Sequence, residues 1–176
     1  ASMPLCFWND PDFARYREAY LESYPGYWRH GDLIEMTEQG GVIVYGRSDA
    51  TLNPGGVRIG TAEIYRPLEP LPELLEAAAV GKKEGGDEVI WLFVVLQPGL
   101  ALTPAIEASI RREIRRHASP RHVPARILAV PQLPRTRSGK AMEMAVARLV
   151  NGGSVPNREV IANPEALDEL RELLEG

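Results

Sequence analysis

The sequence of 176 residues lacks the features that mark several classes of protein. Its single cysteine, Cys6, excludes an internal disulfide bond and is typical of a reducing compartment. The longest apolar run, 89–96, falls far short of the roughly 18 residues that a membrane span needs. No basic stretch followed by an apolar one opens the chain, so we expect no secretory or transit signal. These absences favour a cytoplasmic protein with no membrane partner.

Metal-binding and triad signatures are also missing. The histidines His30, His117 and His122 have no metal-ligand spacing among themselves or with Cys6. The order of serine, histidine and aspartate along the chain does not argue for a catalytic triad. We therefore expect no bound metal.

The composition is that of an ordinary globular protein, with 44% hydrophobic and 25% charged residues. A chain of this length builds one packed domain, or one domain with a short piece of another. Its aromatic residues crowd near the N-terminus around one short predicted helix, 11–22; they are Phe7, Trp8, Phe13, Tyr16, Tyr20, Tyr24, Tyr27 and Trp28. So many aromatic residues on so little structure indicate a surface that packs on something else.

The net charge of −4 conceals an uneven distribution. Residues 108–140 carry nine basic groups and one acidic group in an otherwise acidic chain. A basic patch of this kind usually meets phosphate, in a nucleic acid, a nucleotide or a coenzyme. Arg111 with Arg115, and Arg112 with Arg116, are expected to form exposed stripes on a helix, where solvation alone is an alternative to anion binding.

Hydrophobic periodicity and turn signals predict a small α+β fold, a short central sheet flanked by helices and preceded by a β-hairpin. The hairpin strands are 33–36 and 42–46, closed at Gly40 and Gly41. The other expected strands are 89–96 and 126–130, and the other expected helices are 73–79, 105–117 with Ile106, Ile110 and Ile114 buried, 141–150, and 165–174 with Asn163 at its start.

Two glycine-containing stretches are suited to anion binding. In residues 134–140 (PRTRSGK), backbone amides and the Lys140 ammonium converge as in an anion-binding nest, although a solvated basic turn is the alternative. In the loop 46–60, Arg47 and Arg58 stand beside Gly55 and Gly56, which permit a ligand to approach the backbone closely. The alternative for Arg47 is a surface ion pair.

Four motifs together resemble, in order and spacing, the C-terminal motifs of the adenylate-forming acyl-CoA synthetases. They are residues 27–32 (YWRHGD), 46–49 (GRSD), 55–64 (GGVRIGTAEI) and 134–140 (PRTRSGK). Within that superfamily, residues 3–5, 41–58, 141–152 and 162–165 are similar to the branch that uses acetoacetate. The resemblance implies that residues 1–47 are the tail of a large N-terminal AMP-binding domain that is missing here. It also implies that residues 48–176 are the mobile C-terminal domain.

The resemblance implies a two-step ligation of small-molecule substrates, with ATP, expected as its Mg²⁺ complex, and CoA. Lys140 matches the lysine that reaches the carboxylate and phosphate oxygens in the adenylation step. Asp32 and Arg47 match the residues that bind the ribose, and Arg58 matches an arginine near the nucleotide phosphates. Asp49 matches the hinge residue about which the domain rotates between the two steps.

For the second step, Gly55 and Gly56 match the loop that lines the pantetheine tunnel, and Arg111 matches a basic residue at the CoA nucleotide. A ligase for another short-chain acid and a free-standing CoA or nucleotide-binding module are alternatives. A nucleic-acid binder that uses residues 108–140 is disfavoured, because the aromatic residues are not interleaved with the basic ones.

Overall fold

The computed structural model describes residues 3–48 and 51–175. The chain forms two compact units, Ala1–Asp32 and Leu33–Gly176. Within the described ranges, no helix is long and apolar enough to cross a membrane.

The first unit is built around a short helix, α1 (Ala14–Tyr20), which occupies the middle of the predicted helix 11–22. The Asp10 carboxylate accepts hydrogen bonds from the backbone N–H groups of Arg15 at 3.2 Å and Tyr16 at 3.0 Å. These bonds satisfy donors that the first turn of a helix leaves without partners. Asp10 therefore fixes where α1 begins.

The aromatic residues of this unit pack on one another only in part. Tyr20 stacks on Trp28 with ring centroids 4.9 Å apart, and Phe7 contacts Tyr20 at 5.7 Å. By contrast, the side chains of Trp8 and Tyr27 remain 93% and 76% exposed. The unit thus presents large aromatic surfaces that its own residues do not cover, as the sequence predicts.

The hairpin forms as expected. β1 (Asp32–Met36) and β2 (Val42–Arg47) make a two-stranded sheet. The Thr37 N–H donates to the Gly41 carbonyl at 2.9 Å, and the Gly40 N–H donates to the Thr37 carbonyl at 2.9 Å. These two bonds close the turn where the glycine pair predicts it.

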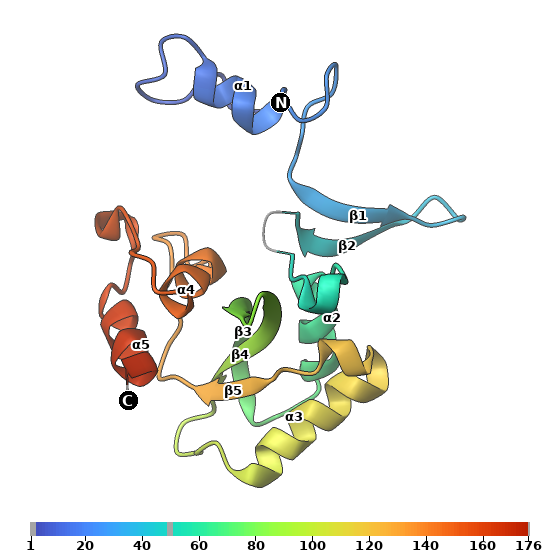
Figure 1. Cartoon of the computed structure of the whole chain (residues 1–176), viewed down its shortest axis with the longest axis vertical. Coiled ribbons are helices and arrows are strands. Elements are labelled where there is room, and N and C mark those ends of the chain that lie inside the picture. The colour runs from blue at the N-terminus through green and yellow to red at the C-terminus, as the bar shows by residue number, and fades with distance from the viewer. Residues whose placement is uncertain (1–2, 49–50, 176) are drawn as a thin grey trace. The chain divides into compact units, whose positions relative to one another are not determined.

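The core of the second unit is a three-stranded sheet in the order β3-β4-β5 (Figure 1). β3 (Leu74–Glu84) and β4 (Asp87–Leu96) are antiparallel, whereas β5 (Arg126–Ala129) runs parallel to β4. The strands predicted at 89–96 and 126–130 are confirmed.

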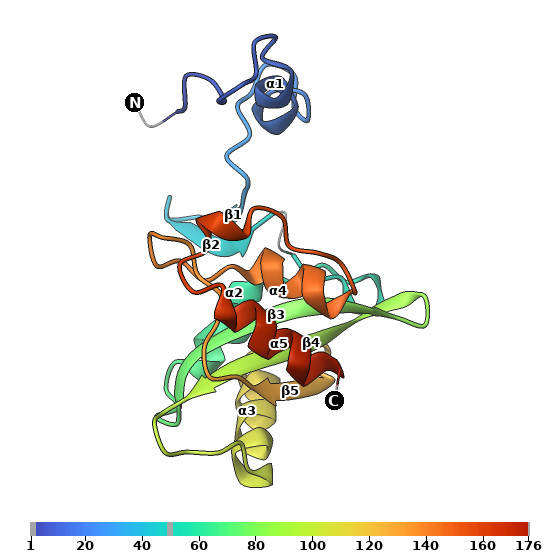
Figure 2. The same cartoon turned by 90° about the vertical axis from the view of Figure 1, so that its left-hand side faces the viewer.

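Two C-terminal helices cover one face of this sheet, α4 (Glu143–Val150) and α5 (Glu165–Glu175) (Figures 1 and 2). Phe93 of β4 is fully buried and packs in one cluster with Val146 of α4 and Leu167 of α5. This cluster fixes both helices to the sheet. It thereby also fixes the segments that lead into the two helices.

The other face is covered by α2 (Thr61–Tyr65) and α3 (Pro104–His117). Ile110 and Ile114 of α3 are completely buried, and Ile106 packs against them partly exposed. The four-residue spacing of these isoleucines correctly predicts the buried face of α3. With the sheet covered on both faces, the predicted α+β class is confirmed.

One element prediction is wrong. Residues 73–79 were expected to be helical, but they belong to β3 apart from Glu73. Glu, Leu and Ala favour helices intrinsically, yet consecutive residues here pair with β4. Their side chains are buried on both faces of the sheet, with Ala78 in one cluster and Ala79 in the other. Tertiary packing therefore overrides local propensity, and burial on both faces removes the alternation that marks a strand.

Candidate functional site

Residues 134–140 form a tight turn that presents Lys140 to solvent. The Thr136 N–H donates to the Lys140 carbonyl at 2.9 Å, and the Gly139 N–H donates to the Thr136 carbonyl at 2.8 Å. Gly139 has a φ of 83°, which a residue with a side chain adopts only with strain. The Lys140 side chain is exposed, and its ammonium makes no ion pair with the described residues 3–48 and 51–175. This cation is available to an anionic ligand.

The segment just before α5 holds the start of this turn. The Ala162 N–H donates to the Arg135 carbonyl at 2.8 Å. The Asn163 side chain accepts a hydrogen bond from the Arg135 N–H at 2.8 Å and donates one to the Leu133 carbonyl at 3.0 Å. Asn163 lies at the start of α5 as predicted, but its side chain binds the turn. Asn163 and Arg135 are 28 positions apart in the chain, so no local sequence pattern could predict this contact.

Gly55 and Gly56 lie on an exposed loop, with left-handed φ values of 59° and 76°. Two carboxylates at the start of β4 hold the loop by its backbone. The Gly55 N–H donates to Asp87 Oδ1 at 3.0 Å, and the Asn53 N–H donates to Glu88 Oε1 at 2.6 Å. The loop therefore offers a fixed backbone with no side chains at the two glycines. The glycines stand out in the sequence, whereas nothing in the sequence indicates that these two carboxylates hold the loop.

The turn and the loop line different hollows in the second unit. Arg135 and Gly139 line one of about 350 Å³. Pro54 and Gly55 line another of about 290 Å³, together with Arg121. The two hollows share no lining residue.

The structure describes Arg47 and Arg58 but not the predicted hinge. Arg47 is the exposed last residue of β2. Arg58 is exposed, and its Nη2 donates to the Ser48 carbonyl at 3.0 Å, which holds the guanidinium near the end of β2. Asp49, the predicted hinge residue, lies outside the described residues.

Asp32 is the last residue of the first unit, where its carboxylate contacts the imidazole Nδ1 of His30. Arg47, its predicted companion, belongs to the second unit. The pairing of Asp32 with Arg47 at a ribose stays a prediction.

Arg111 is turned back onto its own chain. Its Nη1 donates to the Pro124 carbonyl, its Nη2 donates to the Ala125 carbonyl at 3.4 Å, and Nη2 lies 3.8 Å from Glu107 Oε2. Arg111 is therefore only partly exposed, whereas Arg115 is exposed as expected. In the predicted stripe of Arg111 and Arg115, Arg115 is therefore the more exposed cation.

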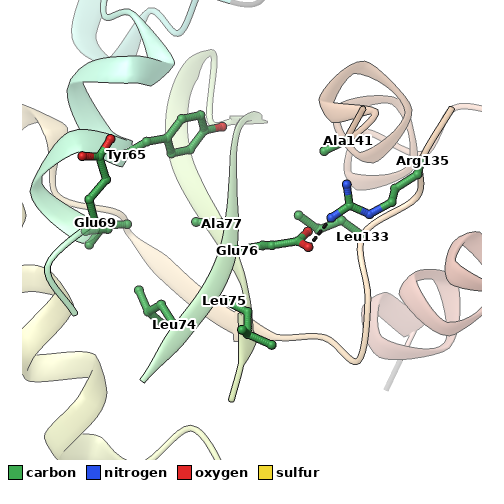
Figure 3. A pocket seen from close by; sticks show the side chains of 10 residues that line it. Tyr65, Glu69, Leu74, Leu75, Glu76, Ala77, Leu133, Arg135 and Ala141 are labelled. Carbon is green, nitrogen blue, oxygen red and sulfur yellow. Dashed lines mark ion pairs between the residues drawn. The ribbon is translucent and has the colours of Figure 1, made fainter. Parts of the chain in front are cut away.

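A hollow of about 380 Å³ lies beside the basic turn, lined largely by apolar side chains together with Tyr65, Glu76 and Arg135 (Figure 3). The Tyr65 hydroxyl donates to Glu143 Oε1 at 2.6 Å and accepts from the Ala79 N–H at 2.9 Å. Burial raises the pKa of Tyr65 well above its ordinary value, and the nearby Glu143 carboxylate adds to the effect. Burial also raises the pKa of Glu143.

His122 connects the end of the α3 region to the start of α2. Its Nδ1 lies 2.8 Å from Ser119 Oγ, and its Nε2 lies 3.2 Å from Glu63 Oε2. The same glutamate accepts the Gly60 N–H at 2.9 Å, and the serine accepts the Arg121 N–H at 3.2 Å. Both partners of the imidazole are thus engaged with backbone, which makes this a structural contact. Among the described residues, no three His, Cys, Asp or Glu side chains are placed to hold a metal.

Residues 68–140, from Leu68 shortly after α2 through Lys140, match the family model of the AMP-binding enzyme C-terminal domain. The matched residues are fewer than half of the chain. The basic turn at Lys140 closes the matched region, and the sheet β3-β4-β5 lies within it.

Two relatives and one solved structure show the same similarity over almost the whole chain. Acetoacetyl-coenzyme A synthetase of Rhizobium meliloti is 54% identical over 95% of this chain and 26% of its own length. Acetoacetyl-CoA synthetase of Caenorhabditis elegans is 48% identical over 95% of this chain and 24% of its own. The structure of acetoacetyl-CoA synthetase from Streptomyces lividans superposes with a TM-score of 0.86, at 44% identity, over 98% of this chain and 26% of that one.

The chain spans about a quarter of the length of the curated relatives that it matches. It is similar to the C-terminal portion of acetoacetyl-CoA synthetases. A structure of anthranilate CoA ligase with anthranoyl-AMP, at 22% identity and a TM-score of 0.73, shares the fold.

Proposed function

We propose that the chain is the C-terminal portion of an acetoacetate–CoA ligase. This enzyme converts ATP, acetoacetate and CoA into AMP, pyrophosphate and acetoacetyl-CoA. The observation that carries the proposal is the 54% identity to an acetoacetyl-coenzyme A synthetase over 95% of the chain. The catalytic AMP-binding domain lies in the remaining three-quarters of such an enzyme, so the chain alone is expected to be inactive.

Within that ligase we assign residues 1–47 to the tail of the large N-terminal domain and residues 48–176 to the mobile C-terminal domain. The exposed aromatic side chains of Trp8 and Tyr27 support the first assignment, because surfaces of this kind normally pack against another part of a protein. The separate core of the sheet and its helices supports the second.

In the adenylation step, acetoacetate attacks the α-phosphorus of ATP and pyrophosphate leaves. We assign Lys140 to this step as the cation that stabilises the developing charge on the phosphate and orients the carboxylate. Its exposure on a hydrogen-bonded turn supports the assignment, because a preorganised cation stabilises a transition state at little cost in reorganisation. Lys140 acts here electrostatically and forms no bond to the substrate.

We assign the other nucleotide contacts from the family motifs. Asp32 and Arg47 bind the ribose, Arg58 lies near the phosphates, and Asp49 is the hinge. The Arg47 and Arg58 side chains are both exposed, which supports these two assignments. Mg²⁺ is expected to accompany ATP in the full-length enzyme.

In the second step, the CoA thiol attacks the acyl carbon of the adenylate and AMP leaves. We assign Gly55 and Gly56 to the passage for the pantetheine arm, and Arg111 to the CoA nucleotide. The exposed loop and its location at a hollow away from Lys140 support a division in which each step uses a different face of the domain. Arg111 reaches an anion only if it exchanges some of its present contacts.

A free-standing module that binds CoA or a nucleotide is the second candidate. The observation that favours it is the concentration of nine basic residues in 108–140. Such a module binds CoA in the absence of any other domain, whereas the ligase portion is expected to bind it weakly alone.

A chimera tests the proposal. This chain replaces the matching C-terminal quarter of the Rhizobium meliloti synthetase, and acetoacetyl-CoA formation is measured with acetoacetate, acetate or butyrate as substrate. We expect activity with acetoacetate that depends on ATP and CoA, and no activity from the chain alone. A folded but inactive chimera would contradict the proposal, and tight CoA binding by the chain alone would favour the second candidate.

A further inference from the structure

One arginine joins the basic turn to the central sheet. The Arg135 guanidinium forms an ion pair with Glu76 of β3, and its Nη1 donates a hydrogen bond to the Gly139 carbonyl (Figure 3 shows the ion pair). The Gly139 carbonyl belongs to the peptide bond that leads into Lys140. A single planar group thus binds the backbone next to Lys140 on one side and the sheet on the other.

An irregularity in β3 brings Glu76 to this position. Leu74 pairs with Leu96 and Glu76 pairs with Val95, so Leu75 is an extra residue in β3 opposite β4. A bulge of this kind turns the following side chain away from the direction that a regular strand gives it. Bulges are frequent next to functional sites for this reason.

The ion pair is shielded enough to hold a fixed geometry. The side chains of Arg135 and Glu76 are 33% and 34% exposed, and both line the hollows on either side of the turn. The exposed pair of Arg158 with Asp168, at 2.7 Å and 44% and 52% exposed, is a natural comparison. A guanidinium that makes two directed contacts loses more on replacement by lysine than one that provides charge alone.

We propose that Arg135 and Glu76 are positioning residues for Lys140, which orient its ammonium without touching the substrate. This inference rests on the proposed function and deepens it. When the ion pair is broken, the guanidinium that binds the Gly139 carbonyl loses its attachment to the sheet, and the backbone that sets the direction of the Lys140 side chain is held less firmly. Misplacement of a catalytic group by about 1 Å costs on the order of a hundredfold in rate.

The first experiment tests the structural half of the inference in the 176-residue chain itself, without any assay of activity. Hydrogen–deuterium exchange is followed at the amides of Gly139 and Lys140 in the variants Glu76→Gln and Arg135→Lys. We expect exchange there to accelerate at least fivefold, whereas Asp168→Asn, which breaks the exposed comparison pair, leaves it unchanged. Unchanged exchange in both variants would overturn the inference.

The second experiment uses the chimera and separates the two half-reactions. Glu76→Gln and Arg135→Lys are expected to lower the maximal rate of ATP–pyrophosphate exchange about tenfold, with little change in the KM for ATP. Thioester formation from supplied acetoacetyl-adenylate should stay within twofold of the unsubstituted chimera. The double variant should be no slower than the slower single variant, because the two residues act through one contact.

The outcomes distinguish the inference from the function on which it rests. If Lys140→Ala abolishes pyrophosphate exchange while Glu76→Gln and Arg135→Lys leave it intact, the positioning role is wrong and the proposed function survives. If Lys140→Ala also leaves the exchange intact, the proposed function fails, and the amide-exchange result still decides whether the ion pair holds the turn. An equal loss of both half-reactions in Glu76→Gln would indicate general destabilisation and would overturn the positioning role.

Discussion

The Tyr65 hydroxyl donates a 2.6 Å hydrogen bond to the carboxylate of Glu143, a residue 78 positions further along the chain. The same hydroxyl accepts the Ala79 N–H at 2.9 Å. One side chain at the end of α2 therefore binds β3 and the first residue of α4 together. Because α4 follows the basic turn directly, this contact fixes the C-terminal side of the turn, as Asn163 fixes its N-terminal side.

Replacing Tyr65 with phenylalanine should destabilise the chain by about 1–3 kcal/mol, because it leaves a backbone N–H and a partly buried carboxylate without their partner. Urea unfolding followed by circular dichroism measures this. The matched control is Tyr45→Phe, which removes an exposed hydroxyl bonded to Glu35 in the hairpin and should cost much less stability than Tyr65→Phe. Equal losses in the two variants would contradict the role given to Tyr65.

The Glu143 carboxyl makes a pH-dependent contribution to stability with a predictable sign. Burial raises its pKa in the folded chain above its ordinary value of 4.5. The folded state therefore holds this proton more tightly than the unfolded state, so its contribution is fully present below pH 4.5 and is lost as the pH rises through the raised pKa. Glutamine has no such titration.

We therefore expect the unfolding free energy of the unsubstituted chain to increase relative to that of Glu143→Gln as the pH is lowered from 7 to 4. Urea titrations of the two proteins at matched pH values give this difference. Because the two proteins share all their other carboxylates, the contributions of those groups to the unfolding free energy cancel in this difference. A difference that stays constant, or that moves toward the glutamine variant at low pH, would show that burial does not raise this pKa.

The position of the glycine loop depends on the space that Gly81 leaves free. A Cβ at Gly81 would lie 2.3–2.7 Å from the carboxylate atoms of Glu88, so Gly81→Ala must displace the group that accepts the Asn53 N–H. Gly81→Ala and Glu88→Ala should therefore have the same effect in the chimera. Both should raise the KM for CoA severalfold and leave pyrophosphate exchange unchanged.

The double variant should have a KM for CoA no higher than that of Glu88→Ala alone, because the two substitutions remove the same contact. Steady-state kinetics with varied CoA provide the measurement. A selective loss of pyrophosphate exchange instead would place the loop in the adenylation step.

Local patterns in the sequence predicted those elements whose determinants lie close together. The isoleucine spacing of α3 and the Gly40–Gly41 turn of the hairpin are examples, because periodicity and turn chemistry act over a few residues. The strand β3 was missed because its pairing with β4 and its burial on both faces determine its conformation. Local propensity gave the opposite answer there.

The same distinction applies to the candidate site. Motif residues such as Lys140 and the pair Gly55–Gly56 stand out in the sequence, because the residues that make up each motif are neighbours in the chain. The groups that hold them come from elsewhere. Glu76 reaches the turn through a bulge that involves pairing with another strand, and Asp87 and Glu88 reach the loop from 32 and 35 positions away. Positioning residues of this kind become visible only in the folded chain.

The decisive experiment measures both half-reactions of Lys140→Ala in the chimera. Its matched control is Lys83→Ala, which replaces an exposed lysine at the far end of β3. ATP–pyrophosphate exchange with acetoacetate reports adenylation, and acetoacetyl-CoA formation from supplied acetoacetyl-adenylate reports the second step. Because we assign Lys140 to the adenylation step alone, we expect Lys140→Ala to lose at least a hundredfold in exchange and less than twofold in thioester formation, whereas Lys83→Ala changes neither. Exchange that survives in Lys140→Ala, or an equal loss of both half-reactions, would show that this assignment of Lys140 is wrong.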